Sequence, residues 1–209
     1  MRPTPAQLRA LAHRDPALGR AYKHFGPYPA FPLPAQQRMP HFEYLARCIV
    51  FQQLAGKAAS TIWGRVRELF EGGRVRADAL LELDEDALRG AGLSRQKLAS
   101  VRDLAQRAHS GELRLASLGR LSDAEVIERL TTVRGIGEWT AQMTLIFKLG
   151  RLDVFPPGDL GVLEGLRRMD GDDERLKPKA ALARTECWAP LRSVGTWLMY
   201  RICDTQETP

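Results

Sequence analysis

Apolar residues recur along most of this chain at intervals of three and four, the spacing of one face of an α-helix. From Phe42 the apolar positions 45, 49, 50 and 54 keep this spacing, and a second run extends from Lys57 to Phe70. No segment alternates strictly between apolar and polar residues, as a half-buried strand would, and no internal repeat is visible. The pattern predicts an all-α fold made of short helices.

Residues that favour helix starts precede many of these runs. Asp15 stands before Pro16, Ser94 opens a run that stops at Gly111, and Ser122 with Glu125 forms a capping box. Asp78 and Asp84 are expected to cap short helices, and later helices are expected to start near Asp159, Pro178 and Pro190. Residues 26–40 are rich in proline and aromatic residues, and they predict an irregular connection at a domain boundary.

Composition is ordinary for a folded domain, with a mild basic excess. The 209 residues are 44% hydrophobic and 27% charged, and 31 Lys and Arg stand against 25 Asp and Glu. This excess suits a polyanionic partner without requiring one. There is no signal-peptide pattern and no apolar run of membrane-spanning length. We therefore expect a soluble cytoplasmic protein, associated with the nucleoid if it is bacterial, that has no membrane partner.

Cysteine and histidine give no sign of a metal cofactor. Cys48, Cys187 and Cys203 are scattered, no Cys-x-x-Cys pair occurs, and the four histidines are equally dispersed. Zinc and iron–sulfur sites need clustered ligands, so neither is expected. Free thiols in a reducing compartment are the simplest interpretation, and no cofactor is required.

Gly135-Ile136-Gly137 separates two amphipathic segments. Two glycines let a backbone turn tightly and approach a ligand closely, while free amides at the following helix start attract a phosphate. Such a grip positions a nucleic-acid backbone without reading its sequence. The alternative is a plain connection between two helices, although the longer pattern Gly-Ile-Gly-x-Trp-Thr-Ala is more specific than two glycines alone.

A single acid follows in the turn of residues 154–162, which is rich in glycine and proline. Asp159 precedes an apolar helical run, so its simplest role is to cap that helix. A second role as a reactive carboxylate is compatible with capping, because a helix N-terminus stabilises negative charge. A hairpin suited to binding a DNA phosphate, followed by one acid about twenty residues downstream, suggests an enzyme that acts on DNA.

Several motifs together resemble the helix-hairpin-helix DNA base-excision glycosylase superfamily, and within it the 3-methyladenine DNA glycosylase II (AlkA-type) family. They are Asp15-Pro16-x-Leu18, Phe25-Gly26-Pro27, Ile49-Val50-x-Gln52-Gln53-Leu54, Gly92-Leu93-Ser94-x-x-Lys97, the hairpin, the Asp159 turn, and Ala189-Pro190-x-Arg192-Ser193-Val194-Gly195-x-Trp197. The resemblance extends from about residue 15 to 203. It implies two helical lobes flanking a cleft, one from residues 42–150 with the helix-hairpin-helix at about 122–149, the other from 1–41 and 151–209. The N-terminal β-domain of longer members is expected to be absent.

The resemblance also implies roles for individual residues. Asp159 falls on the catalytic aspartate of the family, and Leu54 falls on the residue that fills the gap left by a flipped base. The base pocket would be lined by Trp139 and Trp188, by the weaker candidates Phe25 and Tyr28, and by Met143, where relatives carry a tyrosine. DNA contacts are expected from Gln53, Lys57, Arg134, Gly135, Ile136, Gly137 and Thr140. A monovalent cation would bind the backbone carbonyls of Thr131, Val133 and Ile136.

The chemistry is consistent with one acid. An N-alkylated purine is already cationic and departs without a strong acid, so a carboxylate has only to stabilise charge at the sugar C1′ and orient a water. Relatives that also cut the strand carry a lysine where this chain has Trp139, so Schiff-base chemistry has no evident agent.

We therefore expect a monomeric, monofunctional DNA glycosylase whose partner is double-stranded DNA with alkylated bases. Two alternatives remain. One is a glycosylase for oxidised or mismatched bases, and the other is a non-catalytic helix-hairpin-helix module in which Asp159 only caps a helix.

Overall fold

The computed structural model describes residues 2–205, and every regular element in that range is helical. The longer α-helices are α1 (Pro5–Arg14), α2 (Pro16–Phe25), α4 (His41–Phe51), α5 (Gly56–Glu68), α8 (Arg95–Ser110), α9 (Asp123–Thr131), α11 (Leu160–Asp170) and α13 (Arg192–Asp204). The shorter ones are α3 (Pro34–Arg38), α6 (Ala77–Glu82), α7 (Glu85–Gly90), α10 (Glu138–Met143) and α12 (Pro178–Arg184). Short 3₁₀ turns and one π turn, η3 (Thr144–Lys148), complete the chain. The predicted all-α class is confirmed.

The chain divides into two compact units. Unit 1 comprises Met1–Leu33 and Leu145–Pro209, and unit 2 comprises Pro34–Thr144. The divisions fall at 33/34 and 144/145, whereas the sequence pattern predicts them at 41/42 and 150/151. The first difference arises because α3 forms inside the proline-rich segment predicted to be irregular, and α3 belongs to unit 2.

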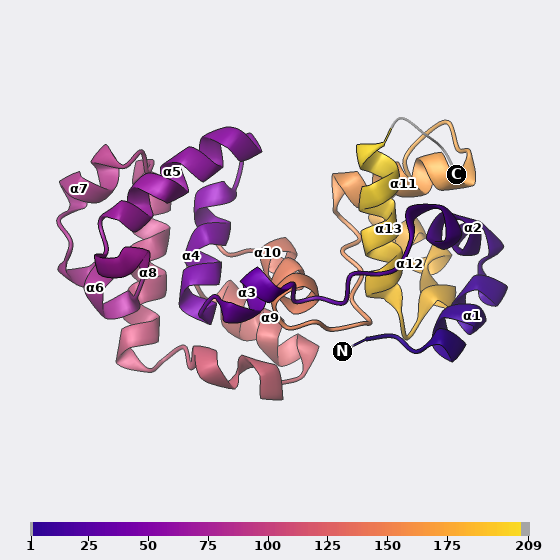
Figure 1. The fold of residues 1–209 in the computed structure, drawn as a ribbon, viewed down its shortest axis with the longest axis horizontal. Helices are drawn as coiled ribbons and strands as arrows, with labels where there is room; N and C mark the ends of the chain where they lie inside the picture. The colour runs from indigo at the N-terminus through magenta and orange to yellow at the C-terminus, as the bar shows by residue number, and fades with distance from the viewer. Residues whose placement is uncertain (1, 206–209) are drawn as a thin grey trace. The chain divides into compact units, whose positions relative to one another are not determined.

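Unit 1 is built on the close pairing of α11 with α13, drawn in orange and yellow in Figure 1. Gly165 makes this pairing possible, because a Cβ at that position would lie 2.3 Å from the carbonyl oxygen of Met199. Leu166 and Leu198 are buried in the core of this unit. This backbone contact fixes the position of α11 along α13, and it thereby fixes the positions of the side chains that the two helices carry where they face one another.

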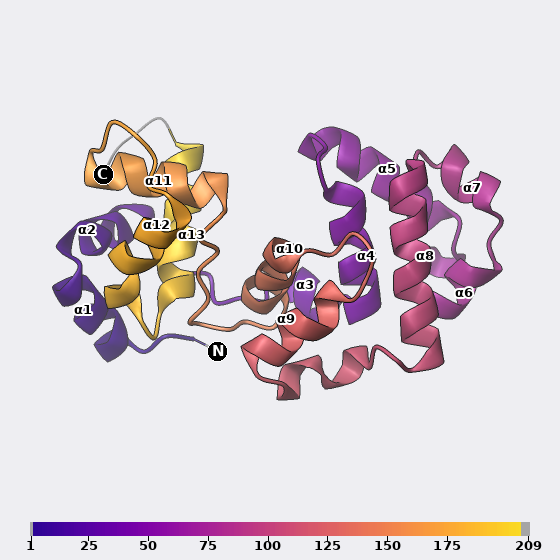
Figure 2. The same ribbon diagram turned by 180° about the vertical axis from the view of Figure 1, so that it is seen from behind.

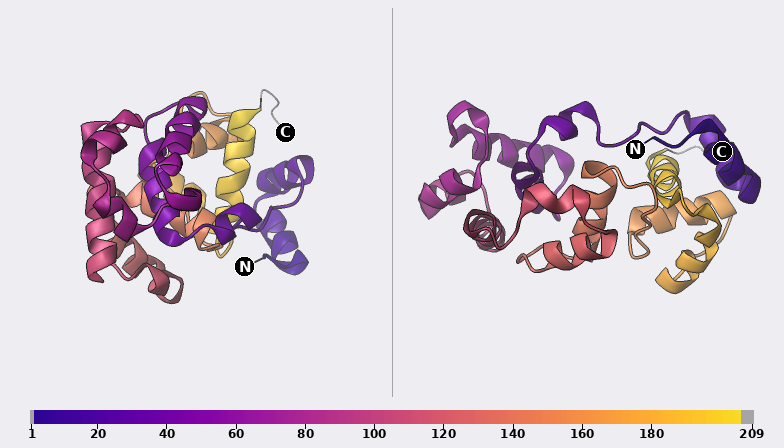
Figure 3. Two further views of the ribbon diagram at one scale, coloured as in Figure 1. Left: turned by 60° about the vertical axis from the view of Figure 1, so that its left-hand side comes forward. Right: turned by 90° about the horizontal axis from the view of Figure 1, so that it is seen from below.

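Unit 2 is organised around α8, which packs against α4 and α6. The purple α4 and the pink α8 lie beside one another in Figures 2 and 3. Leu45 and Ile49 on α4 and Leu104 on α8 are almost wholly buried, which is the apolar face that the spacing in the sequence predicts. Helix α9 packs against α10 and completes the hairpin.

Most of the predicted helix starts are observed. The side chains of Asp15 and Ser94 accept hydrogen bonds from the amides of Leu18 and Lys97, and Ser122 forms its capping box with Glu125. The expectation for Asp78 is wrong, because Arg76 occupies the N-cap and Asp78 lies in the first turn of α6.

Within residues 2–205, no helix has both the length and the apolar character that crossing a membrane requires.

Candidate functional site

The hairpin between α9 and α10 is fixed from inside by α8. Gly135 has a φ of +78°, and a Cβ there would lie 2.5 Å from Ser100 Oγ on α8. Gly137 has a φ of −91°, and a Cβ there would meet nothing within 4 Å. The first glycine is therefore required by the turn, while the second leaves the backbone open on its outer side.

Some amides of the hairpin are already bonded within the protein. The N–H of Arg134 donates to Asp103 Oδ2 over 2.8 Å, and that of Ile136 donates to the carbonyl of Val133 over 3.0 Å. Ile136 is buried, so its side chain anchors the turn in unit 2 and, contrary to the expectation, does not reach DNA. Arg134 itself is exposed, so its guanidinium rather than its amide is available to an outside ligand.

The turn after α4 presents Leu54 to the surface. Gln53 has the unusual φ of +56°, and Leu54 is 38% exposed although it is a large apolar residue. Lys97 holds the end of α4, because its Nζ donates to the carbonyls of Val50 and Gln52 over 2.7 and 2.8 Å. The turn is thus stabilised from beneath while its apolar tip remains outside.

Several predicted DNA-binding residues line a single hollow of unit 2, of about 510 Å³. They are Gln53, Leu54, Arg134 and Gly135. Lys57, in the first turn of α5, is exposed but is not part of this lining. Thr140 differs from the expectation, because its side chain is buried and its Oγ1 accepts a hydrogen bond from Gln52 Nε2 over 3.3 Å. Thr140 joins α10 to the end of α4, and its hydroxyl is not presented to DNA.

A second hollow of unit 2, of about 390 Å³, is lined by Trp139 and Met143, as predicted for a base pocket. Trp139 is 49% exposed. The pattern in the sequence did not indicate that Arg47 and Phe51 also line this hollow, where the Arg47 guanidinium lies 3.9 Å from the centre of the Phe51 ring. Because these two residues are one helical turn apart on α4, their spacing in the sequence could have indicated that their side chains are in contact.

Cys48 also lines this hollow. Burial raises the pKa of the Cys48 thiol to about 11, so it is a weak nucleophile there.

The carboxylate of Asp159 is held at both oxygens within unit 1. Oδ1 accepts the amide N–H of Val162 over 2.9 Å, which caps α11 as the sequence predicts. Oδ2 accepts the hydroxyl of Tyr200, on α13, over 2.7 Å. The side chain is largely buried, and the apolar Leu160 beside it is 67% exposed. Tyr200 was missed because it is 41 residues away along the chain, and no local spacing links the two.

Trp188 is a core residue, and its prediction as a wall of the base pocket is wrong. It has no exposed surface, and its indole N–H donates to Asp15 Oδ2 over 2.7 Å. The ring packs edge-on against Phe155, with centroids 5.9 Å apart. A tryptophan that is fully enclosed and paired with a buried carboxylate stabilises unit 1 rather than contacting a base.

The two weaker aromatic candidates have different surroundings. Tyr28 is 7% exposed and packs edge-on against Phe31 and Trp197. Phe25 is half-buried at the end of α2, with the guanidinium of Arg201 5.8 Å from its ring centre. Tyr28 is enclosed, whereas the Phe25 ring keeps an accessible surface.

The carbonyls predicted to hold a cation lie at the end of α9, where the helix dipole favours positive charge. The carbonyl of Val133 accepts the Ile136 amide and retains a second lone pair. Thr131 is the last residue of α9 and Ile136 lies in the hairpin, so the three predicted carbonyls come from one short stretch of the chain. Across residues 2–205, no cluster of three His, Cys, Asp or Glu side chains is suited to a metal.

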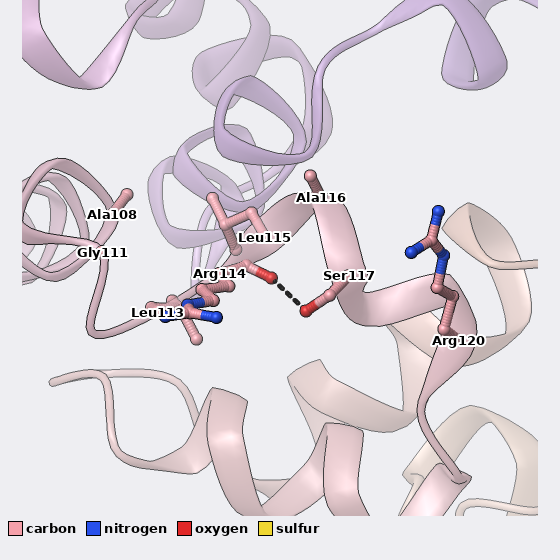
Figure 4. Close-up of a pocket in the computed structure, with 8 residues that line it drawn as sticks. All are labelled: Ala108, Gly111, Leu113, Arg114, Leu115, Ala116, Ser117 and Arg120. Atoms are coloured by element: carbon pink, nitrogen blue, oxygen red, sulfur yellow. Dashed lines mark hydrogen bonds between the residues drawn. The ribbon is translucent and has the colours of Figure 1, made fainter.

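Another hollow, of about 550 Å³, lies where α8 ends and the 3₁₀ turn of Leu115–Arg120 follows (Figure 4). Ser117 Oγ donates to the carbonyl of Arg114 over 2.8 Å, and Arg120 also lines it. Its lining contains no carboxylate, so it offers no counterpart to Asp159.

Comparison with known proteins agrees with these features. The model of the HhH-GPD superfamily base excision DNA repair protein matches residues 46–192. DNA-3-methyladenine glycosylase 1 of Schizosaccharomyces pombe is 32% identical over 169 residues, which are 80% of this chain and 74% of the relative.

Two solved structures share the fold over almost the whole chain. A DNA-3-methyladenine glycosidase from Bacillus halodurans has a TM-score of 0.84 at 33% identity, covering 97% of this chain and 90% of that one. The Schizosaccharomyces pombe 3-methyladenine DNA glycosylase in complex with abasic DNA has a TM-score of 0.81 at 30% identity, covering 94% and 95%. With its hairpin, its capping aspartate and these matches, the chain belongs to the HhH-GPD superfamily of base excision DNA repair proteins.

Proposed function

We propose that this protein is a monofunctional DNA N-glycosylase that removes alkylated, cationic purines such as 3-methyladenine from duplex DNA and leaves an abasic site. The observation that carries the proposal is Asp159, a largely buried carboxylate fixed at both oxygens beside an exposed apolar residue. The names of the relatives, 3-methyladenine DNA glycosylases, support the substrate class.

Asp159 acts on the sugar. The C1′–N bond breaks and its electron pair neutralises the positive charge of the departing base. A fixed carboxylate stabilises the positive charge that develops at C1′, orients the water that adds there, and accepts the proton that this water loses. A cationic base leaves without protonation, so a second acid is unnecessary, unlike in ordinary glycoside hydrolysis.

Unit 2 supplies the features needed to bind DNA. The outer side of Gly137 and the exposed Arg134 suit a phosphate, while Leu54 fills the space that a flipped base leaves. Trp139, which is 49% exposed, and Phe51 line a hollow whose aromatic side chains suit a flat base. The binding partner is double-stranded DNA, and the protein acts as a monomer in the cytoplasm.

A monovalent cation bound by the carbonyls of Thr131, Val133 and Ile136 would add positive charge beside the phosphate grip. The family generally works without a cofactor, so this ion would assist binding rather than catalysis.

The absence of a lysine at position 139 favours base release without strand cleavage. Borohydride trapping of a covalent complex with abasic DNA tests this. No trapped complex is expected, and a trapped complex would contradict the monofunctional assignment.

The central experiment measures free methylpurines released from methylated duplex DNA by the wild type, by Asp159→Asn and by the control Asp172→Asn. Asp172 is an exposed acid of unit 1 in the turn after α11. We expect release by the wild type and the control, and a loss of at least about 100-fold in Asp159→Asn with DNA binding retained. Release by none of the proteins, with binding intact, would instead indicate a non-catalytic DNA-binding module.

A further inference from the structure

The hydrogen bond from Tyr200 to Asp159 is a feature that helix capping does not require. An N-cap aspartate is satisfied by one backbone amide, here that of Val162. The Tyr200 hydroxyl donates to the other oxygen, Oδ2, over 2.7 Å. The bond therefore acts on the carboxylate itself rather than on the helix.

The packing of α11 against α13 fixes this bond. A Cβ on Gly161 would lie 3.3 Å from both Asp159 Oδ1 and Tyr200 Cε1, so the missing side chain leaves room for the phenol ring. One turn later, Gly165 brings the α13 backbone at Met199 against α11. This backbone contact therefore places Tyr200, the residue after Met199, beside the first turn of α11.

The phenol ring of Tyr200 also lies near other aromatic rings. The rings of Phe147 and Tyr200 are tilted by 37°, with centroids 6.3 Å apart, and Phe147 also packs edge-on against Phe31 at 4.7 Å. These rings limit the rotation of Tyr200, so the loss of its hydroxyl removes a hydrogen bond without removing the packing.

We propose that Tyr200 is a positioning residue for the glycosylase reaction: its hydroxyl fixes the orientation of the Asp159 carboxylate. This inference rests on the proposed function, because it assigns Asp159 the role of stabilising charge at C1′. A carboxylate that is already fixed needs no reorganisation when the sugar becomes positive.

The kinetic test compares the wild type, Tyr200→Phe and the control Tyr22→Phe in single-turnover release of 3-methyladenine. Tyr22 is a half-buried tyrosine on α2 in the same unit. Removal of one hydrogen bond to a charged group should slow release by roughly 10- to 100-fold at saturating enzyme. The dissociation constant for abasic DNA should change less than about twofold, since the bond is internal. An unchanged rate in Tyr200→Phe, or an equal loss in binding and rate, would overturn the proposal.

A second measurement does not depend on activity. With 3-fluorotyrosine placed at position 200, the fluorine resonance should shift in Asp159→Asn and remain in place in Asp172→Asn. A fluorine chemical shift that is unchanged in Asp159→Asn would show that the hydrogen bond is absent in solution and would overturn the proposal. If the fluorine shift is seen but the wild type releases no methylated base, the proposed function fails and the contact stands as a structural one.

Discussion

Gln52, immediately after α4, donates from its side-chain Nε2 to the carbonyl oxygen of Gly135 in the hairpin over 2.9 Å. The same amide lies 3.3 Å from Thr140 Oγ1 at the start of α10. One side chain therefore joins the turn that presents Leu54 to the loop that is proposed to hold the DNA backbone. The two segments of unit 2 that are proposed to contact DNA are consequently parts of one hydrogen-bonded structure.

Replacing Gln52 by Leu should weaken both stability and DNA binding. The change leaves the Gly135 carbonyl without this donor, which typically costs about 1 kcal/mol in the free energy of unfolding. Urea denaturation measures this loss, and fluorescence anisotropy with abasic DNA measures affinity. Gln106→Leu, at an exposed position of α8, is the matched control. Affinity as high as that of the wild type in Gln52→Leu would contradict the linkage between turn and hairpin.

The two hairpin glycines should respond differently to alanine. Gly135→Ala forces a residue with a Cβ to a φ of +78° and against Ser100 Oγ, and such conformations cost about 1–2 kcal/mol before the steric contact is added. Gly137→Ala meets no atom within 4 Å and should leave the free energy of unfolding nearly unchanged.

DNA affinity should distinguish the effect of Gly137→Ala from its effect on stability. Because Gly137 leaves the backbone open, an added methyl group stands between the amides and a phosphate, so Gly137→Ala should lose DNA affinity while it remains folded. Calorimetry for stability and anisotropy for affinity report the two effects. Normal DNA binding by Gly137→Ala would argue against the phosphate grip at this position.

Much of the helical structure follows from local signals that the sequence displays. Asp15, Ser94 and Ser122 cap helices because a short polar side chain before an apolar run satisfies free amides, whatever the tertiary fold. The same logic places Asp159 at the start of α11. The prediction that Asp78 caps a helix is wrong because an acid is equally favourable one or two positions inside a helix. The residue type alone therefore does not locate the first residue of the helix.

Long-range partners account for what the sequence did not reveal. Trp188 matched a pocket position in the family motif, yet its environment depends on Asp15, 173 residues away. Tyr200 and Asp159 are brought together only by the pairing of α11 with α13. Thr140 is likewise drawn inward by Gln52. A motif identifies which residues matter, but three-dimensional packing decides which of their atoms remain free.

Leu54 should be needed for catalysis on duplex DNA and dispensable for folding. It is 38% exposed, so Leu54→Ala removes little buried surface and should change the free energy of unfolding by less than about 0.5 kcal/mol. Without an apolar side chain to fill the gap, base flipping is disfavoured, and release from duplex DNA should fall.

The control is Leu182→Ala, a comparably exposed leucine on α12 that is 47% exposed. Release of methylpurines from duplex and single-stranded DNA is compared for both variants. A single strand has no gap to fill, so the defect of Leu54→Ala should shrink there. Equal defects on both substrates would rule out a wedge.

Cys48 should be poorly reactive although it lines the aromatic hollow. Burial raises the pKa of its thiol from 9.0 to about 11, which lowers the thiolate population roughly 100-fold at neutral pH. Labelling with iodoacetamide at pH 7.5, followed by peptide mass spectrometry, should modify Cys48 far more slowly than an unstructured thiol, and the rate should rise steeply with pH. Denatured protein serves as the control, and equal labelling of native and denatured Cys48 would contradict the prediction.

Trp188→Phe should destabilise unit 1 in a manner that depends on pH. Burial opposes the ionised form of Asp15, but hydrogen bonds from Arg184, Trp188 and the Leu18 amide outweigh it and lower the pKa of Asp15 below its ordinary 3.8. Loss of the indole N–H removes a bond to a charged group and should cost about 1.5–3 kcal/mol at neutral pH. Phenylalanine keeps part of the ring packing, so the hydrogen bond dominates the change.

The direction of the pH dependence follows from the lowered pKa. A carboxyl group whose pKa is lowered by folding contributes stability above its unfolded pKa and loses that stability as the pH falls through the folded value. The deficit of Trp188→Phe should therefore be largest near pH 7 and shrink as the pH falls below 3.8 and then through the lower pKa that Asp15 has in the folded protein. Urea denaturation from pH 7 to pH 3 measures it, with Asp15→Asn as the background in which the pH dependence should vanish. A deficit that stays constant across this range would show that ring packing, and not the bond to Asp15, makes Trp188 important.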